Sequence, residues 1–246
     1  MREDLRRVGV LAAKEIVDTF KNPTMIFCIV MPFAFTVFFR LIVGDGAVAG
    51  ETADPALQHM VLSVALCMSI GLGGSVVSVY SLAEAREKHA LRTLLLANVS
   101  AGQIVAARGV ASFGLTMAAE LLCFAVSGVA WVFLGWYLLF GALGAVPVVL
   151  LSLAAGSASR DQMTAGLYSL PVLLLAVSPM LGDFAASVET VVQLAPTGGM
   201  DSLLQLVLGG RLTLAAAAGP LAVTAVWTAV GAAALGRLCQ RFFRAS

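Results

Sequence analysis

Residues 109–159 read GVASFGLTMAAELLCFAVSGVAWVFLGWYLLFGALGAVPVVLLSLAAGSAS. This stretch lies between Arg108 and Arg160, and Glu120 is its only charged residue. An apolar helix needs about 20 residues to cross the hydrocarbon core of a bilayer. The stretch is too long for one crossing helix and has the length of two, so it predicts a transmembrane hairpin with Gly135 at its tip.

The rest of the chain has the same apolar character. Hydrophobic residues make up 60% of the 246 residues, charged residues make up 12%, and the mean hydropathy is +0.96. A soluble domain is roughly 25% charged, so this chain has too few polar side chains to cover a surface in water. The net charge of +1 excludes a polybasic nucleic-acid footprint. The composition predicts an all-α integral membrane protein.

Six spans result when the chain is cut at charges and turn residues. They cover residues 23–43, 60–82, 109–133, 138–157, 163–181 and 214–235. Residues 1–22 precede this single six-span transmembrane domain, which extends over 23–246. The two longest connections are a loop over 83–108 and a segment over 182–213.

The positions of Lys and Arg predict the orientation, because cytoplasmic loops retain these residues. Thirteen of the 15 lie before the first span, after the second and fourth spans, or in the C-terminal tail. Only Arg211 lies on the opposite side, and Arg40 falls in the last turn of the first span, where it can reach outward. Both termini are therefore expected in the cytoplasm, and the 182–213 segment outside.

An amphipathic pattern precedes the first span. Ala13, Ile16, Val17 and Phe20 share one helical face, while the charged residues around them fall elsewhere. This pattern predicts a helix that lies in the cytoplasmic interface of the membrane. An ordinary cytosolic lead-in is the alternative interpretation.

Residues that could carry catalysis are scarce. The two histidines, His59 and His89, lie outside the spans, so a catalytic dyad within the membrane has no base. None of the three lysines follows the glycines of a phosphate-binding loop, and no cluster of metal ligands is visible. We expect a chain that is not an enzyme and binds no cofactor or metal.

Cysteines and small residues within the spans are interpreted as packing residues. The cysteines form no CxxC pair; they are Cys28, Cys67, Cys123 and Cys239. Two pairs of small residues at helical spacing predict close helix contacts. These pairs are Gly71 with Ser75, and Ala232 with Gly236.

Glu120 is the one charge deep inside a predicted span. A charged group at that depth costs on the order of 2.5 to 3.5 kcal/mol even on the most lenient insertion scale. It is either a polar group on a substrate or ion path, or a protonated carboxyl that is hydrogen-bonded to a neighbouring helix.

The loop after the second span combines charges with an apolar stripe. Residues 82–110 read LAEAREKHALRTLLLANVSAGQIVAARGV, with charges concentrated at the start and three leucines, Leu91, Leu94 and Leu95, on one helical face. Ser100 is placed to cap a second helix that leads into the third span. A short helix outside the membrane would not expose these leucines unless a partner covered them.

This arrangement resembles the ABC transporter type-2 permease family, the membrane subunits of one class of ATP-driven exporters, over nearly the whole chain. The loop residues that match the family pattern are Glu84, Arg86, Glu87, Lys88, Leu91, Leu94, Leu95, Val99 and Ser100. His89-Ala90 stands where the family usually has Gly-Thr, and Asn98 where it has proline.

A second match lies in residues 191–210, which read VVQLAPTGGMDSLLQLVLGG. This segment looks like the family's external re-entrant helix, with matches at Leu194, Pro196, Asp201, Leu204 and Leu208. Its apolar part is too short to cross a bilayer. An external interfacial helix is the alternative.

The resemblance implies a subunit that exports an amphipathic or hydrophobic drug, lipid or peptide across the inner or plasma membrane, expected to be bacterial. Residues 84–96 would form a coupling helix in a cleft of a separate P-loop ATP-binding subunit, present in two copies, which binds ATP and Mg. The residues expected to contact it are Glu84, Arg86, Glu87, Lys88, Leu91 and Leu94. A second permease chain, identical or related, would complete the path.

Three rival interpretations remain. The first is a secondary transporter in which Glu120 carries a coupling ion, although one mid-membrane carboxylate and no visible inverted repeat disfavour it. The second is a sensory or immunity membrane protein that binds a peptide or lipid without moving it. An intramembrane enzyme comes last, for lack of histidines and metal ligands.

Overall fold

The computed structural model describes residues 2–49, 53–87, 99–182 and 189–244 of the chain. These residues form helices joined by turns, and no strand occurs among them. Six helical segments in these ranges are long and apolar enough to cross a membrane. They are Pro23–Val43, Pro55–Ala85, Gly102–Ser127, Trp131–Ala158, Gln162–Leu181 and Leu214–Leu238. The predicted helical class is confirmed, and the six apolar helices indicate a multi-pass membrane protein.

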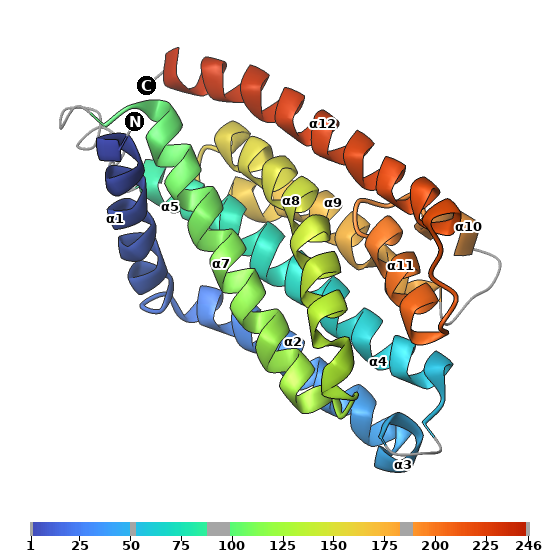
Figure 1. The fold of residues 1–246 in the computed structure, drawn as a ribbon. Coiled ribbons are helices and arrows are strands. Elements are labelled where there is room, and N and C mark those ends of the chain that lie inside the picture. Colours follow the sequence, from blue (N-terminus) through green and yellow to red (C-terminus); the bar gives the residue numbers. More distant parts are fainter. Residues whose placement is uncertain (1, 50–52, 88–98, 183–188, 245–246) are drawn as a thin grey trace.

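The helices follow one another in the order shown in Figure 1. In chain order they are α1 (Arg2–Thr19), α2 (Pro23–Val43), α3 (Asp45–Val48), α4 (Pro55–Met68), the π-helix η1 (Ser69–Val76), α5 (Val77–Glu87), α7 (Ala101–Ser127), the 3-10 turn η2 (Trp131–Phe133), α8 (Leu134–Ala158), α9 (Gln162–Val177), the 3-10 turn η3 (Ser178–Leu181), α10 (Glu189–Val192), α11 (Gly198–Leu208) and α12 (Leu214–Arg244).

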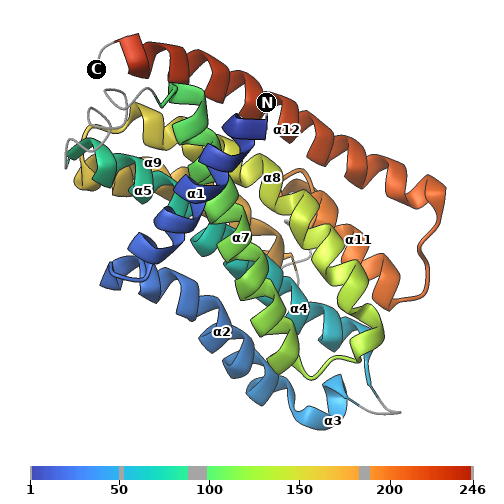
Figure 2. The ribbon, with the colours of Figure 1, turned by 60° about the vertical axis from the view of Figure 1, so that its left-hand side comes forward.

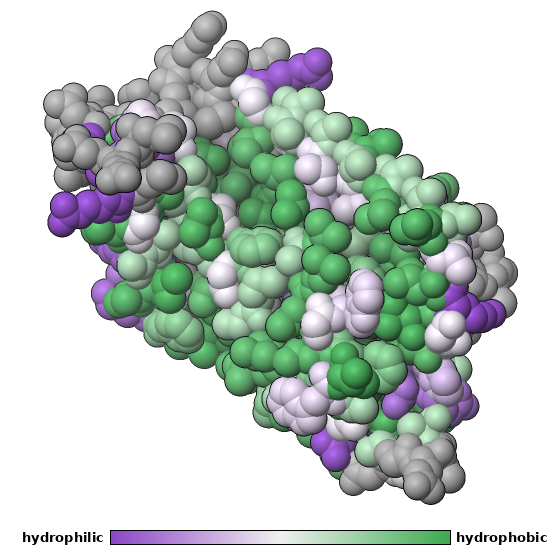
Figure 3. Space-filling model, viewed as in Figure 1, coloured by the Kyte–Doolittle hydropathy of each residue, from purple (hydrophilic) through white to green (hydrophobic). Residues whose placement is uncertain are grey.

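The second span is the centre of the bundle. α4, η1 and α5 continue one another, and this span is the most deeply buried of the six. It packs against α2, α7, α8 and α9, whereas α12 lies at the rim against α8 and α11. Both chain termini lie at the same end of the bundle (Figures 1 and 2). The face in Figure 3 is largely hydrophobic, as expected for side chains that meet lipid.

The predicted hairpin tip at Gly135 is wrong. α7 ends at Ser127, and Gly128 caps it with a φ of +82°, which favours glycine because it lacks a Cβ. The turn therefore comes seven positions earlier, and Gly135 lies in the first turn of α8.

The third span begins earlier than its apolar run. The Ser100 hydroxyl accepts from the Gln103 N–H at 3.3 Å, and the Gln103 side chain accepts from the Ser100 N–H at 3.0 Å. This reciprocal cap starts α7 at Ala101, so the polar lead-in and the span form one helix.

The apolar face predicted for α1 is divided between two surroundings. Ala12, Ile16 and Thr19 face the bundle, where Ala12 packs with Ala107 of α7. Val17 and Phe20 remain more than half exposed. α1 therefore packs on α7 through a face beside the predicted apolar one, and the position of that apolar face in the membrane interface stays a prediction.

The two predicted small-residue contacts differ in outcome. A Cβ at Gly71 would lie 2.8 Å from Val177 and 2.9 Å from Leu173, so the backbone of η1 does approach α9 closely. Gly236 has nothing within 4 Å of the position that a Cβ would take. The contact predicted at Gly236 is wrong for this chain alone, because α12 diverges from its neighbours there.

Candidate functional site

A charged pocket of about 740 Å³ opens among α1, α5 and α7, at the end of the bundle where both termini lie. Its lining includes three acidic and three basic side chains. They are Glu15, Asp18, Glu84, Lys14, Lys21 and Arg108. Such a concentration of charge is unusual in this chain and marks the pocket as a candidate site.

Arg108 joins three helices in this pocket. Its side chain is only 4% exposed, and one guanidinium nitrogen donates to the Glu15 carboxylate of α1 at 2.8 Å. A second nitrogen donates to the Ser81 carbonyl of α5. Arg108 belongs to α7, so a single side chain connects the helix before residues 88–98 with the helix after them and with α1.

Glu15 is the counter-charge of this arginine. Burial raises the pKa of Glu15, and the nearby Arg108 charge acts in the opposite direction. A buried pair of this kind is costly to break, because either partner alone would leave an uncompensated charge. The pair therefore holds α1 against α7 in a defined register.

Glu84 and Glu87, two of the predicted coupling residues, hold the end of α5 in place. The Asn22 side-chain amide, which precedes α2, donates to the Glu84 carboxylate at 3.3 Å. The backbone N–H of Gln162, at the start of α9, donates to the Glu87 carboxylate at 3.3 Å. The last turn of α5 is thus tied to the beginnings of two spans.

Asp161 caps the start of α9 beside this contact. Its carboxylate accepts from the Thr164 N–H at 2.8 Å, and this backbone hydrogen bond lowers the pKa of Asp161. The cap fixes the first turn of α9. The N–H that Gln162 offers to Glu87 is therefore held in position.

The other predicted coupling residues are only partly within the described structure. Arg86 lies in α5, but its side chain is not among the described parts of the structure. Lys88, Leu91 and Leu94 lie wholly outside the described residues. The predicted coupling helix and its contacts with an ATPase stay predictions.

Sequence reasoning missed the pairing of Arg108 with Glu15. A signal was present, since Arg108 lies at the edge of a long apolar stretch and needs an acidic partner there. The partner is 93 residues away. Only the packing of α1 on α7 reveals it.

Glu120 lies about two turns before the end of α7 and is completely buried. Neither carboxylate oxygen has a hydrogen-bond partner among the described residues. Gly141 of α8 lies directly opposite, and a Cβ at that position would collide with the carboxylate. One of the two interpretations of Glu120 was a protonated carboxyl that is hydrogen-bonded to a neighbouring helix. No such hydrogen bond occurs in the described part of the chain.

The surroundings of Glu120 are polar for the interior of a membrane bundle. The Tyr137 hydroxyl is buried and also lacks a described partner, and the Cys123 sulfur lies 3.6 Å from the Ser69 hydroxyl. One turn before Glu120, Thr116 lies against Gly73 of the π-helix, where a Cβ would be 3.2 Å from the threonine hydroxyl. π-Helices often occur at functional positions, and this one adjoins the buried carboxyl.

The opposite end of the bundle holds the segment that was predicted to be external. The His59 ring nitrogen of α4 lies 3.4 Å from the Asp201 carboxylate of α11. Asp201 and Leu204 are buried, and the Leu194 carbonyl accepts from the Trp227 indole at 2.7 Å. α11 thus packs into the bundle against α4, α8 and α12. The re-entrant position of this segment in the membrane stays a prediction.

Comparisons with known proteins do not assign the chain: no protein-family model matches it, and no curated protein matches its sequence. Among the described residues, no group of three His, Cys, Asp or Glu side chains gathers as metal ligands would. The function is therefore inferred from the two arrangements above, the charged pocket and the buried carboxyl.

Proposed function

We propose that this chain is the membrane-spanning permease subunit of an ATP-binding cassette exporter. In this proposal the chain moves an amphipathic or hydrophobic drug, lipid or peptide out of the cytoplasm. A separate P-loop subunit, present in two copies, binds ATP and Mg and hydrolyses the ATP. A second permease chain completes the assembly in the inner or plasma membrane, expected to be bacterial.

One observation supports this proposal above the others: the connections on both sides of residues 88–98 are tied to the bundle by charged contacts. Glu84 and Glu87 hold the helix that enters the segment, and Arg108 holds the helix that leaves it. These contacts reach α1, α2 and α9 as well. A force applied to residues 88–98 would therefore reach several helices at once, as mechanical coupling to a partner requires.

The centre of the bundle offers an element that could respond to such a force. η1 lies in the same span as α5, and its π-type hydrogen bonding is less regular than that of an α-helix. Its glycines pack against α7 and α9. Movement of α5 can therefore change the packing around Glu120 without unfolding a regular helix.

The experiment is co-purification with the products of neighbouring genes. The tagged chain is extracted in mild detergent, bound proteins are identified by mass spectrometry, and ATP hydrolysis is measured. We expect a P-loop ATPase that is lost from the Leu91→Asp/Leu94→Asp variant. Leu214→Asp is the matched control, because Leu214 is 94% exposed at the other end of the bundle. Isolation of the folded chain with no ATPase would contradict the proposal.

An ion-coupled carrier is the second candidate, and the buried Glu120 favours it. A carboxyl without a described hydrogen-bond partner is suited to take up and release a proton or another cation. In that case Glu120→Gln would abolish the dependence of transport on a proton or sodium gradient. If transport needs ATP and is unaffected by Glu120→Gln, the ion-coupled carrier is excluded and the exporter is the remaining candidate.

A further inference from the structure

A histidine and a carboxylate from two different helices meet at the end of the bundle opposite the chain termini. The Nε2 atom of His59, in α4, lies 3.4 Å from the carboxylate oxygen Oδ1 of Asp201, in α11, and 3.3 Å from the Asp201 backbone carbonyl oxygen. The two side chains are only 5% and 10% exposed. This buried contact joins the central span to a helix residue that lies 142 positions further along the chain.

The Asp201 carboxylate is short of hydrogen bonds on the side that faces His59. Its Oδ1 atom is buried and has no hydrogen-bond partner among the described residues. An ionised carboxylate in such surroundings is costly unless a positive charge lies beside it. Among the residues that line the small pocket at this contact, His59 and Asp201 are the only titratable ones. His59 is therefore the group of this pocket that can supply the positive charge.

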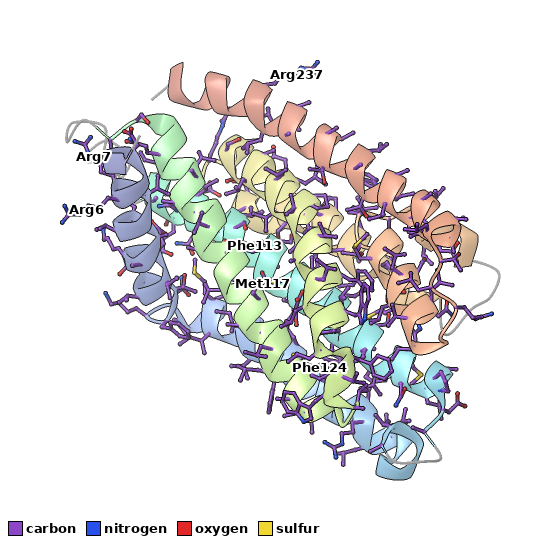
Figure 4. All side chains as sticks on the ribbon, viewed as in Figure 1. Arg6, Arg7, Phe113, Met117, Phe124 and Arg237 are labelled. Carbon is purple, nitrogen blue, oxygen red and sulfur yellow. The ribbon has the colours of Figure 1, made fainter. Side chains whose placement is uncertain are left out.

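The other charged side chains of the surrounding helices lie away from this pocket. α4 and α11 pack against each other and against α2, α3, α7, α8, α9, α12, η1 and η3. The described charged residues of these elements, or at the ends of α4 and α11, do not line the pocket; they are Arg40, Asp54, Arg108, Glu120, Arg211 and Arg237. Figure 4 shows Arg237, with Arg6 and Arg7 of α1, toward the end of the bundle that holds both termini.

Three kinds of contact hold α11 in the bundle. Leu204 belongs to the buried apolar core. The Thr197 hydroxyl, just before α11, donates to the Ala176 carbonyl of α9 at 2.7 Å. The third contact is that of Asp201 with His59, and it differs from the other two because a proton can change its charge.

Protonation of His59 changes the balance of charge at this contact. A neutral imidazole with its hydrogen on Nε2 can donate to the Asp201 carbonyl oxygen, but it leaves the carboxylate without a counter-charge. The imidazolium places a positive charge 3.4 Å from the carboxylate, where burial strengthens the attraction. An unperturbed imidazole titrates at about pH 6.5. The attraction is therefore present at low pH and is lost as the pH rises and His59 releases its proton.

We propose that His59 and Asp201 form a proton-operated latch that fastens α11 to α4. Binding of a proton by His59 closes the latch, and release of that proton opens it. The pocket beside the pair has a volume of about 130 Å³, which at about 30 Å³ per molecule holds about four waters. Water in this pocket gives the proton a route to the imidazole. The inference does not depend on the proposed export function.

Hydrogen–deuterium exchange of the purified full chain in detergent tests the latch. Exchange is measured at about pH 5.5 and about pH 8, on either side of the ordinary imidazole titration, and is corrected for the intrinsic pH dependence of amide exchange. We expect the amides of α11 to be at least about fivefold more protected at the lower pH, because the latch must open before they exchange. Peptides from α8, which has no acidic or basic side chain, should show no such difference.

Two substitutions at the contact remove its charge and keep its hydrogen-bonding groups. His59→Gln and Asp201→Asn should each abolish the pH dependence of α11 protection, because each leaves the pair without one of its two charges. His89→Gln is the matched control: it removes the only other histidine of the chain and should leave the pH dependence intact. Protection of the α8 peptides reports whether each variant is folded.

Four results would overturn the proposal. Equal protection of α11 at the two pH values would show that the contact does not respond to a proton. A pH dependence that survives His59→Gln would belong to a different titratable group. One that survives Asp201→Asn would show that the imidazolium acts without this carboxylate. An equal change in α11 and α8 would show a general effect of pH on the bundle.

Discussion

Gly141 of α8 faces Glu120 of α7 so closely that a single added methyl group would collide with the carboxylate. The two helices are adjacent members of the hairpin, and the glycine creates the space in which the carboxyl lies. The buried carboxyl group is thus accommodated by the backbone of its neighbour rather than by a described hydrogen bond.

Gly141→Ala should therefore destabilise the folded chain. The added methyl group forces the carboxylate to move within a packed interior, which typically costs about 1–3 kcal/mol. Thermal unfolding in detergent measures the effect. Combining it with Glu120→Ala should restore most of the stability, because the smaller side chain no longer occupies the same space. If the double variant loses as much free energy of unfolding as the two single variants together, the two positions do not compete for the same space.

Arg108→Gln should also lower the free energy of unfolding, because Glu15 would lose its counter-charge. Breaking a fully buried ion pair costs about 3–5 kcal/mol. The Glu15 side chain is 21% exposed, so we expect a smaller loss, about 2 kcal/mol. The double variant Glu15→Gln/Arg108→Gln should be more stable than Arg108→Gln alone. A double-mutant cycle without coupling would show that the pair does not hold α1 on α7.

The stability of the Arg108→Gln variant should depend on pH in a defined direction. Burial raises the pKa of Glu15 in the folded chain, so the folded state binds this proton more tightly than the unfolded state. Lowering the pH through the interval between the two pKa values therefore favours folding. Loss of the Arg108 charge raises the pKa further and widens the interval. The deficit in Tm relative to the wild type should be smaller at about pH 5 than at about pH 8.

Gly128→Ala should be destabilising, whereas Gly135→Ala should not. Gly128 has a φ of +82°, a conformation that costs an L-residue about 1–2 kcal/mol, and its Cβ would lie 3.1 Å from the Arg40 guanidinium. Gly135 is in a helix with nothing within 4 Å, so alanine there should stabilise by up to about 1 kcal/mol. Unfolding curves of the two variants test the position of the hairpin tip. A tip at Gly128 predicts that only Gly128→Ala is destabilising, and a tip at Gly135 predicts the reverse.

The sequence predicted the parts of the fold that depend on local composition. Six apolar runs indicated six helices, and the isolated Glu120 stood out because its neighbours are apolar. Gly128 and Gly135 look alike in sequence, and only the backbone conformation shows which one ends a helix. The pairing of Glu15 with Arg108 depends on how α1 rotates against α7, and small differences in side-chain packing decide that rotation. The missing contact at Gly236 likewise depends on the path of α12 relative to its neighbours.

Photo-crosslinking from position 91 identifies the molecule that covers the proposed coupling helix. A photoreactive amino acid replaces Leu91 in the full chain, intact cells are irradiated, and the protein in the adduct is identified by mass spectrometry. The proposed function predicts an adduct with a P-loop ATPase from position 91 and none from position 214, at the start of α12. Adducts from position 91 that contain lipid alone, while the chain remains folded in the membrane, would contradict the assignment as an exporter subunit.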